Sequence, residues 1–253
     1  MYKIFIILFL YLILYLLIKK ITQEDFKEQT KIMIILPIRN RDTYLDNYLK
    51  NVLPILKKQN IDYKIIIVEQ SPDKLFNKGK INNIGFKEGT RMFNSINNIY
   101  FNDIDNFPLN SNVINFNEPI KNVKHFFGYK HCLGGIFSVN KNIFNKINGF
   151  SNNFYGWGYE DVDIQNRFVI NKINISRSNF LERKNNKNIF FDEITKKKNK
   201  KTTNLNITKS NNYFKLYNNN KKNIFKDGLN TCNYKIKKKN EIYKNVFRIK
   251  VDL

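Results

Sequence analysis

Three short apolar runs, separated by two segments with helical spacing, constrain the fold of this chain more than any other feature. The runs are Ile32–Leu36, Tyr63–Val68 and Ile99–Phe101, and each has the length of a strand buried on both faces. Apolar residues recur at helical spacing within Leu45–Leu56 and again within Asn77–Glu88. This alternation of strands and helices predicts an α/β fold with a parallel sheet and helices on both of its faces.

Residues that favour turns predict where other elements begin and end. Pro37 should end the first strand, and Pro54 should kink or end the first helix, because proline lacks the amide hydrogen. Further along the chain we expect a strand after Gly134-Gly135, a helix around Lys141–Ile147, a Gly/Asn/aromatic loop at Gly149–Tyr159, a helix at Glu160–Val169, a largely solvated Lys/Asn-rich insertion at about Lys184–Lys222, a turn at Asp227-Gly228 and a strand pair within Asn233–Val251.

An uninterrupted apolar run near the N-terminus, Ile4–Ile18, is flanked by Lys3 and by Lys19-Lys20. The run is shorter than the roughly 20 residues that cross a bilayer, but lysines at both ends extend its effective span. No A-x-A-like cleavage site follows, so an uncleaved signal anchor is favoured over a cleaved signal peptide or a buried helix. We therefore expect a tip and transmembrane helix at residues 1–21, a short stem at 22–31 and a globular domain at 32–253. The basic residues at both ends of the run leave its orientation open.

Composition excludes several classes of protein. The chain has 44 Lys and Arg against 21 Asp and Glu, a formal net charge of +23, and 42% of its residues are hydrophobic. That hydrophobic content excludes disorder of the whole chain. Two Cys and two His exclude a disulfide framework and an ordinary Cys/His zinc site. The lysines concentrate in the Lys/Asn-rich insertion without an aromatic-rich nucleic-acid motif, so we expect no nucleic-acid partner.

Charged residues follow the first and third predicted strands at their carboxyl ends, where parallel sheets bind ligands. Arg39 and Arg41 follow the first strand, and guanidinium groups suit bidentate phosphate contacts. Asp103 and Asp105 follow the third at alternate positions, so both can face one metal-bound diphosphate. Mn²⁺ and Mg²⁺ prefer such carboxylate oxygens. Lys78, at a predicted helix start, favours an anion as well. Each motif alone is also typical of a solvated turn or surface residue.

The single Trp of the chain lies in an unusual setting. Trp157 is flanked by Gly156 and Gly158 and is followed by Glu160 and Asp161 at a predicted helix start. An aromatic ring between glycines can stack on a sugar and move, and a carboxylate beside it can accept a hydroxyl proton. The alternative is a core Trp followed by acidic residues that complement the helix dipole. Both interpretations stay open on these residues alone.

The order of the motifs carries more information than any one of them. P-x-R-N-R, F-N-[RK], D-x-D, G-G and N-G-F-x-N-x-[YF]-x-G-W-G-x-E-D-x-D follow one another between about Ile32 and Arg177, and D-G-L-N follows at Asp227–Asn230. This order resembles the β-1,4-galactosyltransferase family. The resemblance implies a GT-A nucleotide-diphospho-sugar transferase fold, a Rossmann-like mixed sheet, after an N-terminal transmembrane helix. It also implies an inverting transfer of galactose from UDP-galactose to an acceptor glycan, with Mn²⁺, by a single-pass type II protein of a Golgi-like secretory membrane.

The resemblance also implies a role for individual residues. Asp161 would be the catalytic base with Glu160 beside it, and Asp105 would ligate the metal. The residues implied to bind the UDP-sugar donor are Pro37, Arg39, Arg41, Phe76, Lys78, Asp103, Asp105, Trp157 and Gly158. The residues implied to face the acceptor are Tyr159, Glu160 and Asp161.

Four positions depart from the family pattern. No His follows His131, so the family's Met-x-x-His metal ligands are missing. Asp192 is the best equivalent. A site with only oxygen ligands would shift the metal preference from Mn²⁺ towards Mg²⁺. Cys132 stands where galactose-specific members carry Tyr, which leaves UDP-galactose and UDP-N-acetylgalactosamine both open as donors. Tyr159 stands where the family often has Gly, so the acceptor pocket is expected to differ. Lys78 replaces a family Arg.

A different class of function remains as the alternative. A catalytically decayed protein of the same GT-A fold could bind polyanions or nucleic acid through its net charge of +23. The presence of Asp105, Trp157 and Asp161 together argues against decay. The cysteines, Cys132 and Cys232, are expected to be free thiols, and the histidines, His125 and His131, to be structural or acceptor-side residues rather than metal ligands.

Overall fold

A computed structural model describes residues 11–16, 30–156, 158–186, 190–192, 200–219 and 226–253. The chain divides into two compact units, residues 1–30 and 31–253. In the first unit, residues 11–16 are helical. Within the described ranges, no helix combines the length and the apolar character needed to cross a bilayer. Most of the predicted anchor, Ile4–Ile18, lies outside those ranges and stays a prediction.

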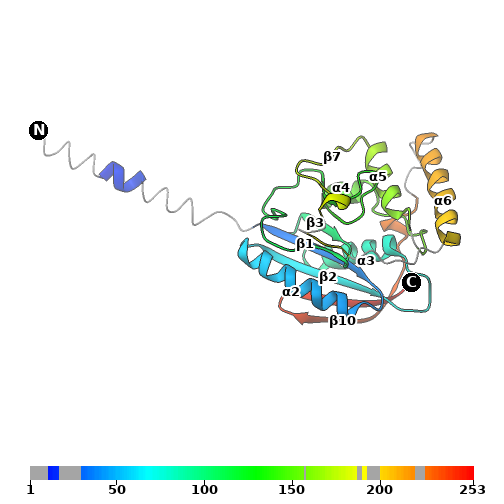
Figure 1. The fold of residues 1–253 in the computed structure, drawn as a ribbon, viewed down its shortest axis with the longest axis horizontal. Helices are drawn as coiled ribbons and strands as arrows, with labels where there is room; N and C mark the ends of the chain where they lie inside the picture. Colours follow the sequence, from blue (N-terminus) through cyan, green and yellow to red (C-terminus); the bar gives the residue numbers. More distant parts are fainter. Residues whose placement is uncertain (1–10, 17–29, 157, 187–189, 193–199, 220–225) are drawn as a thin grey trace, which may run out of the picture. The chain divides into compact units, whose positions relative to one another are not determined.

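The second unit is built on a nine-stranded mixed sheet (Figure 1). The strands of this sheet are β1 (Lys31–Ile38), β2 (Asp62–Gln70), β3 (Asn98–Asn102), β5 (Val123–Gly128), β6 (Ile136–Asn140), β7 (Ile175–Ser176), β8 (Leu181–Glu182), β10 (Lys235–Tyr243) and β11 (Val246–Asp252). Their order is β10-β11-β2-β1-β3-β6-β5-β7, with β8 paired to β5. The four central strands β11, β2, β1 and β3 are parallel, whereas β10 and β6 run antiparallel to their neighbours. A small second sheet pairs β4 (Asn106–Pro108) with β9 (Phe190–Asp192).

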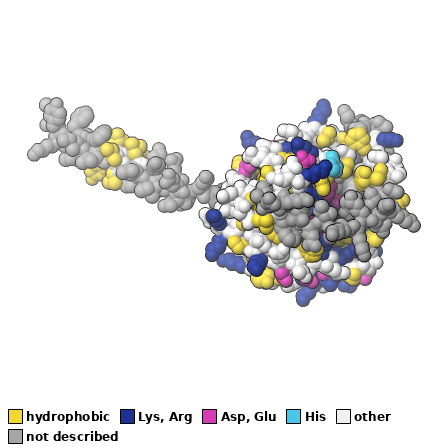
Figure 2. All heavy atoms as spheres, in the orientation of Figure 1, with side chains coloured by type: hydrophobic (Ala, Val, Ile, Leu, Met, Phe, Trp, Pro, Cys, Tyr) yellow, Lys and Arg dark blue, Asp and Glu magenta, His cyan; other side chains and the backbone are white. Residues whose placement is uncertain are grey.

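Lysines dominate the outer edge of the large sheet. Strand β10 exposes Lys235, Lys237, Lys238 and Lys239, and charges on an edge strand discourage pairing with another chain. Two of these charges are partly offset, since Lys237 contacts Asp252 and Lys239 contacts Glu88. Figure 2 shows Lys and Arg side chains dispersed over the visible face of this unit rather than gathered in one patch.

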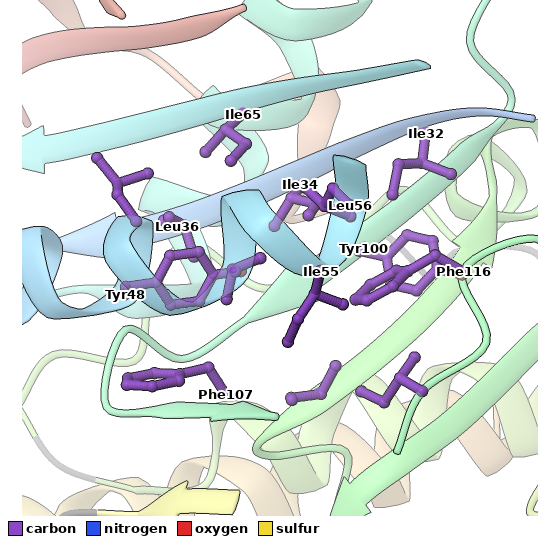
Figure 3. Close-up of a cluster of buried hydrophobic side chains, with 14 of the residues drawn as sticks. Ile32, Ile34, Leu36, Tyr48, Ile55, Leu56, Ile65, Tyr100, Phe107 and Phe116 are labelled. Atoms are coloured by element: carbon purple, nitrogen blue, oxygen red, sulfur yellow. The ribbon is translucent and has the colours of Figure 1, made fainter. Parts of the chain in front are cut away.

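Helices cover both faces of the sheet, as the alternating pattern predicts. The helices are α2 (Asp42–Lys58), α3 (Lys78–Met92), α4 (Lys141–Lys146), α5 (Glu160–Ile170) and α6 (Lys200–Asn219), with short 3-10 turns η1 (Arg183–Asn185) and η2 (Leu229–Thr231). On one face, Tyr48 and Leu56 of α2 pack over Ile34 of β1 (Figure 3). On the other face α3 approaches β1 so closely that a Cβ at Gly85 would lie 2.5 Å from Cγ2 of Ile35. Successive residues of β1 therefore pack into two separate hydrophobic cores, one on each face of the sheet.

The predicted end of the first strand at Pro37 is wrong, and the first helix does not end at Pro54. Strand β1 continues to Ile38 because it pairs with β3 only as far as Ile35, so an open side remains where Pro37 donates no hydrogen bond. Helix α2 continues because Val52, Ile55 and Leu56 are buried around Pro54. Their burial outweighs the roughly 3 kcal/mol that an interior proline costs a helix.

The predicted insertion at Lys184–Lys222 is more ordered than its composition indicates. Phe190 of β9 is buried and its ring stacks on Phe127 at 4.0 Å between centroids. Helix α6 packs against α5 and buries Asn206 and Ser210. Most described side chains of this range are exposed, as predicted, and the buried exceptions on α6 are polar rather than apolar.

His125 of β5 is buried as a neutral group. Its ring packs on Phe180 at 4.6 Å, and its Nε2 lies 3.0 Å from the carbonyl oxygen of Gly134. Its Nδ1 has no hydrogen-bond partner within the described ranges. Burial lowers the pKa of His125 to about 4, because an imidazolium would be poorly solvated there.

This burial predicts a loss of stability in mild acid. Above about pH 6.5 this residue is unprotonated in both the folded and the unfolded chain. Between about pH 6.5 and pH 4 the unfolded chain binds a proton at this residue and the folded chain does not. The free energy of unfolding therefore falls by up to about 3 kcal/mol across this range. Urea unfolding between pH 7.5 and 4.5 measures the slope. His125→Gln should flatten it and His131→Gln, at an exposed position, should not. Equal slopes in His125→Gln and the wild type would contradict the assignment.

Candidate active site

A cavity of about 680 Å³ opens beyond the carboxyl ends of β1 and β3, beside the first turns of α3 and α5. Every predicted site residue with a described side chain lines it. These residues are Pro37, Arg39, Arg41, Phe76, Lys78, Asp103, Asp105, Cys132, Gly158, Tyr159, Glu160 and Asp161. The topology explains the convergence, because parallel strands end at one edge of the sheet and their connections start there.

Lys78 lies at the centre of the polar lining. Its Nζ is 3.2 Å from Oδ1 of Asp103, 3.0 Å from Oε1 of Glu160 and 2.8 Å from Oδ2 of Asp161. Asn77 caps α3 and so fixes the start of the helix that carries Lys78. Burial by itself lowers the pKa of Lys78, but the three carboxylates together raise it well above the ordinary value. The lysine therefore stays charged and draws together Asp103, which follows β3, and two carboxylates of α5.

Asp161 has the environment of a proton acceptor. It lies in the first turn of α5, and its carbonyl oxygen accepts a hydrogen bond of 3.1 Å from the amide of Leu133. Burial raises the pKa of Asp161 to about 7, with Glu160 and Asp103 adding to the rise and Lys78 opposing it. A carboxyl group that titrates near neutral pH suits general base catalysis. Gly134 leaves room for it, since a Cβ there would lie 2.7 Å from Oδ2 of Asp161.

Asp103 and Asp105 form an acidic pair in the lining of the cavity. The amide of Gly135 donates to Oδ2 of Asp103 at 3.1 Å, and Nη1 of Arg41 lies 2.8 Å from Oδ2 of Asp105. Burial and the neighbouring Asp103 raise the pKa of Asp105, while Arg41 opposes the rise. Two neighbouring carboxylates in a polar cavity, one of which has its ionisation disfavoured by burial and by the other, fit a hard divalent cation such as Mn²⁺ or Mg²⁺.

Asp103 and Asp105 are the carboxylates nearest to hand for such a cation in the described part of the cavity. Within the described ranges, no three His, Cys, Asp or Glu side chains group so as to hold a metal ion. Strand β9 places the backbone of Asp192 opposite Asn106, the residue after Asp105. The side chain of Asp192 lies outside the described part of the structure, as does all of Trp157, so their proposed roles stay predictions.

Aromatic contacts line the rim of the cavity. The guanidinium of Arg39 lies over the ring of Phe76 at 5.7 Å and donates to the carbonyl oxygen of Lys74. The carbonyl oxygen of Phe76 accepts a 2.8 Å hydrogen bond from the amide of Gly156. The predicted donor-binding segment is thereby joined to the glycine loop that leads into α5.

Cys132 and Cys232 are both free, buried thiols. Cys132 lies beside Asp161, whereas Cys232 lies elsewhere in the fold. Burial, followed by the charge of Asp161, raises the pKa of Cys132 to about 12. The thiol stays protonated and acts as a small apolar side chain in the cavity wall. Its free state agrees with the prediction that the two cysteines form no bridge.

Three further residues that line the cavity, Tyr129, His131 and Arg183, lie outside the motifs of the sequence analysis. The guanidinium of Arg183 lies over the ring of Tyr129 at 5.5 Å, and that ring stacks on His131 at 5.5 Å. Pairing of β8 with β5 brings Arg183 to the cavity, where its charge, like that of Arg41, opposes the rise in the pKa of Asp105. Of these three, only His131 was named in the sequence analysis, as a structural or acceptor-side residue, and it lines the cavity.

Known proteins share this arrangement of sequence and fold. A model for the N-terminal region of glycosyl transferase group 7 matches residues 19–116, and one for the N-terminal domain of galactosyltransferase matches residues 116–190. The chain belongs to the β-1,4-galactosyltransferase family. β-1,4-Galactosyltransferase 1 of Bos taurus is 38% identical over 157 residues, which are 59% of this chain and 39% of the relative. β-1,4-Galactosyltransferase 4 of Cricetulus griseus is 34% identical over 164 residues, which are 62% of this chain and 47% of that relative. The chain thus spans less than half the length of these curated family members.

A solved structure shows the fold of the family. The catalytic domain of Drosophila β1,4galactosyltransferase 7, in complex with xylobiose, superposes with a TM-score of 0.70 over 88% of this chain and 94% of that chain, at 23% identity. A mutant of the same enzyme in complex with manganese, UDP-Gal and xylobiose superposes with a TM-score of 0.66. The mixed α/β sheet is therefore similar to GT-A glycosyltransferase structures.

Proposed function

We propose that this protein is an inverting, metal-dependent galactosyltransferase, which moves galactose from UDP-galactose to a hydroxyl group of an acceptor glycan in β-1,4 linkage. The observation that carries the proposal is Asp161, a carboxyl group that titrates near neutral pH in the same cavity as Asp103, Asp105, Arg41 and Lys78. Membership of the family supports the reaction class. The Drosophila family member bound to manganese, UDP-Gal and xylobiose supports the choice of donor, cation and a sugar acceptor.

The residues divide the reaction between them. Asp161 accepts the proton of the acceptor hydroxyl, and the hydroxyl oxygen attacks the anomeric carbon from the face opposite UDP. The bond from that carbon to the UDP oxygen breaks, UDP leaves with the electron pair, and the anomeric configuration inverts. Arg41 and Lys78 lie where they can offset the charge of the diphosphate. Glu160 lies where it can accept a second hydrogen bond from the acceptor. A Mn²⁺ or Mg²⁺ ion held by Asp105 would neutralise charge on the leaving diphosphate.

The donor sugar depends on one small side chain. Cys132 lines the cavity next to Asp161 and is smaller than the tyrosine of galactose-specific family members. UDP-N-acetylgalactosamine is accordingly the second donor that we propose, because a thiol occupies less volume at this position than a phenol ring.

Anchoring to a membrane is part of the proposal. The apolar run Ile4–Ile18 between lysines supports a single-pass type II anchor in a Golgi-like secretory membrane. Retention of the full chain in membranes washed with alkaline carbonate, and its release when Leu10 and Leu14 are both changed to Lys, would support the anchor. Release of the unaltered chain would contradict it.

The protonation of Asp161 predicts a pH profile for the reaction. The base must be ionised to accept a proton, so kcat/KM should fall about tenfold per pH unit below the pKa of about 7 and level off above it. Initial rates of UDP release at subsaturating acceptor, from pH 5.5 to 8.5, give the profile. Equilibrium binding of UDP across the same range shows whether donor affinity accounts for the change. A flat profile would exclude Asp161 as the titrating base.

A donor and acceptor panel tests the function itself. The full chain in detergent is incubated with Mn²⁺ or Mg²⁺, with UDP-galactose or UDP-N-acetylgalactosamine, and with acceptors that end in N-acetylglucosamine, glucose or xylose. UDP release and product mass identify the donor and acceptor, and the coupling constant of the new anomeric proton identifies a β linkage. No turnover with any pair, no metal-dependent UDP binding and tight binding to heparin would overturn the proposal in favour of a polyanion-binding protein.

A further inference from the structure

Asn206 of α6 contacts the glycine loop that precedes α5. Its side chain is only 3% exposed, although asparagine is usually a surface residue. Its Nδ2 donates to the carbonyl oxygen of Tyr155 at 3.1 Å and to that of Gly158 at 3.1 Å. These two carbonyls lie on either side of residues 156 and 157, so one side-chain amide spans the loop.

The backbone of this loop is held in an unusual conformation. Gly156 has φ +82°, Gly158 has φ +97° and Tyr159 has φ +74°. A side-chain-bearing residue such as Tyr159 adopts a left-handed φ only where its surroundings fix it. Tyr159 makes no side-chain cap to α5, although it is the N-cap residue. The conformation therefore depends on contacts from other elements, and Asn206 supplies two of them.

Polar contacts on one face of α6 attach the helix beside the loop. Nζ of Lys209 donates to the carbonyl oxygen of Asn153 at 2.5 Å and lies 6.0 Å from the centre of the Phe154 ring. Ser210 is buried, and positions 206, 209 and 210 share one helical face. Asn206 and Lys209 thus place this face of α6 against the residues immediately before α5.

We propose that Asn206 is a positioning residue, which fixes the junction between the glycine loop and α5 and thereby the placement of Glu160 and Asp161. The inference rests on the proposed function and deepens it. Asn206 does not line the cavity and acts through Gly158 and Tyr159, both of which do. The segment of the chain that composition marks as a solvated insertion hence contributes to the catalytic geometry.

The single tryptophan makes the junction measurable without substrate. Trp157 is the only Trp of the chain and lies in sequence between the two carbonyls that Asn206 contacts. In Asn206→Asp, a side chain of the same size can no longer donate to either carbonyl. Acrylamide quenching of Trp157 fluorescence in the full chain should rise about twofold, because the loop opens locally more often. The matched control is Asn212→Asp, an exposed position on the same helix, which should quench like the wild type.

Turnover provides the second readout. Misplacement of Asp161 should lower kcat in Asn206→Asp about tenfold, with a smaller change in the KM for the acceptor, and leave Asn212→Asp unaffected. Quenching equal to that of the wild type would overturn the proposal, and so would altered quenching with unchanged kcat. If the wild type itself shows no turnover, the proposed function fails while the quenching comparison still tests whether Asn206 fixes the loop.

A second variant covers the case in which Asn206→Asp does not fold. Lys209→Gln weakens the attachment of α6 to Asn153, because the glutamine donor is uncharged and one atom nearer the backbone, and it leaves both loop carbonyls untouched. Its thermal unfolding should stay close to that of the wild type, and its Trp157 quenching should rise in the same direction as in Asn206→Asp. Unchanged quenching in a folded Lys209→Gln protein would overturn the role of α6.

Discussion

Replacing Asp161 with Asn is expected to lower kcat by about 100- to 10,000-fold, the usual contribution of a positioned general base. Asn has the shape of Asp but cannot accept the proton of the acceptor hydroxyl. Binding of UDP should change little, because Arg41, Asp105 and the other groups implied to hold the nucleotide remain. Stability at pH 8 should not fall, since burial disfavours the charged carboxylate that is removed. Initial rates of UDP release with saturating donor and acceptor measure the effect.

The control for this variant is Asp46→Asn. Asp46 is an exposed acidic residue of α2 that does not line the cavity, and its replacement should leave kcat within about twofold of the wild type. An Asp161→Asn protein that keeps more than about a tenth of the wild-type kcat would remove Asp161 from the role of base. Glu160→Gln, tested in parallel, would then show whether the neighbouring carboxylate takes that role.

Replacing Arg167 with Met is expected to lower the free energy of unfolding by about 3–5 kcal/mol, the usual cost of breaking a buried ion pair. The Arg167 side chain is 0% exposed, and its Nε lies 2.8 Å from Oδ2 of Asp163. Its Nη1 donates to the carbonyl oxygens of Gly149 at 3.0 Å and Asp227 at 2.9 Å. Met fills the volume but leaves the Asp163 carboxylate buried without its cation. Urea unfolding at pH 7.5 measures the loss.

The double variant separates the charge from the packing. Burial already raises the pKa of Asp163, and Arg167 opposes that rise. With Asp163→Asn added to Arg167→Met, no unpaired charge remains, so the double variant should be more stable than Arg167→Met alone by about 1–3 kcal/mol. A single variant that loses less than about 1 kcal/mol, or a double variant without recovery, would show that the pair contributes little to stability.

The central part of the fold follows from local patterns in the sequence. Ile32–Leu36 and Tyr63–Val68 are uninterrupted apolar runs because parallel strands are covered on both faces, and β1 and β2 contain them. Asn77 begins a helix for a local reason, since its side chain accepts a hydrogen bond from the amide of Lys80. Nothing local indicates that β6 enters the sheet antiparallel to β3, or that β11 returns from the C-terminus to pair with β2.

The candidate site also contains residues that local sequence patterns predict and residues that they do not. Asp103 and Asp105 follow a strand and Asp161 begins a helix, so their convergence is a consequence of the predicted topology. Arg183 reaches the cavity only because β8 pairs with β5, and two-residue strands leave no periodic signal. Asn206 lies in a segment rich in Lys and Asn, where the sequence does not distinguish a buried, hydrogen-bonded asparagine from the solvated asparagines around it.

The burial of Asn206 also constrains covalent modification of the chain. Asn206-Ile207-Thr208 has the N-x-[ST] pattern of an N-glycosylation acceptor, as has Asn174-Ile175-Ser176. An N-linked sugar replaces one of the two amide hydrogens, and Nδ2 of Asn206 donates to two carbonyl oxygens in the folded chain. A glycan at this position and the attachment of α6 to the loop therefore exclude one another. In a secretory compartment, the time that α6 takes to dock after synthesis would decide which of the two a given molecule receives.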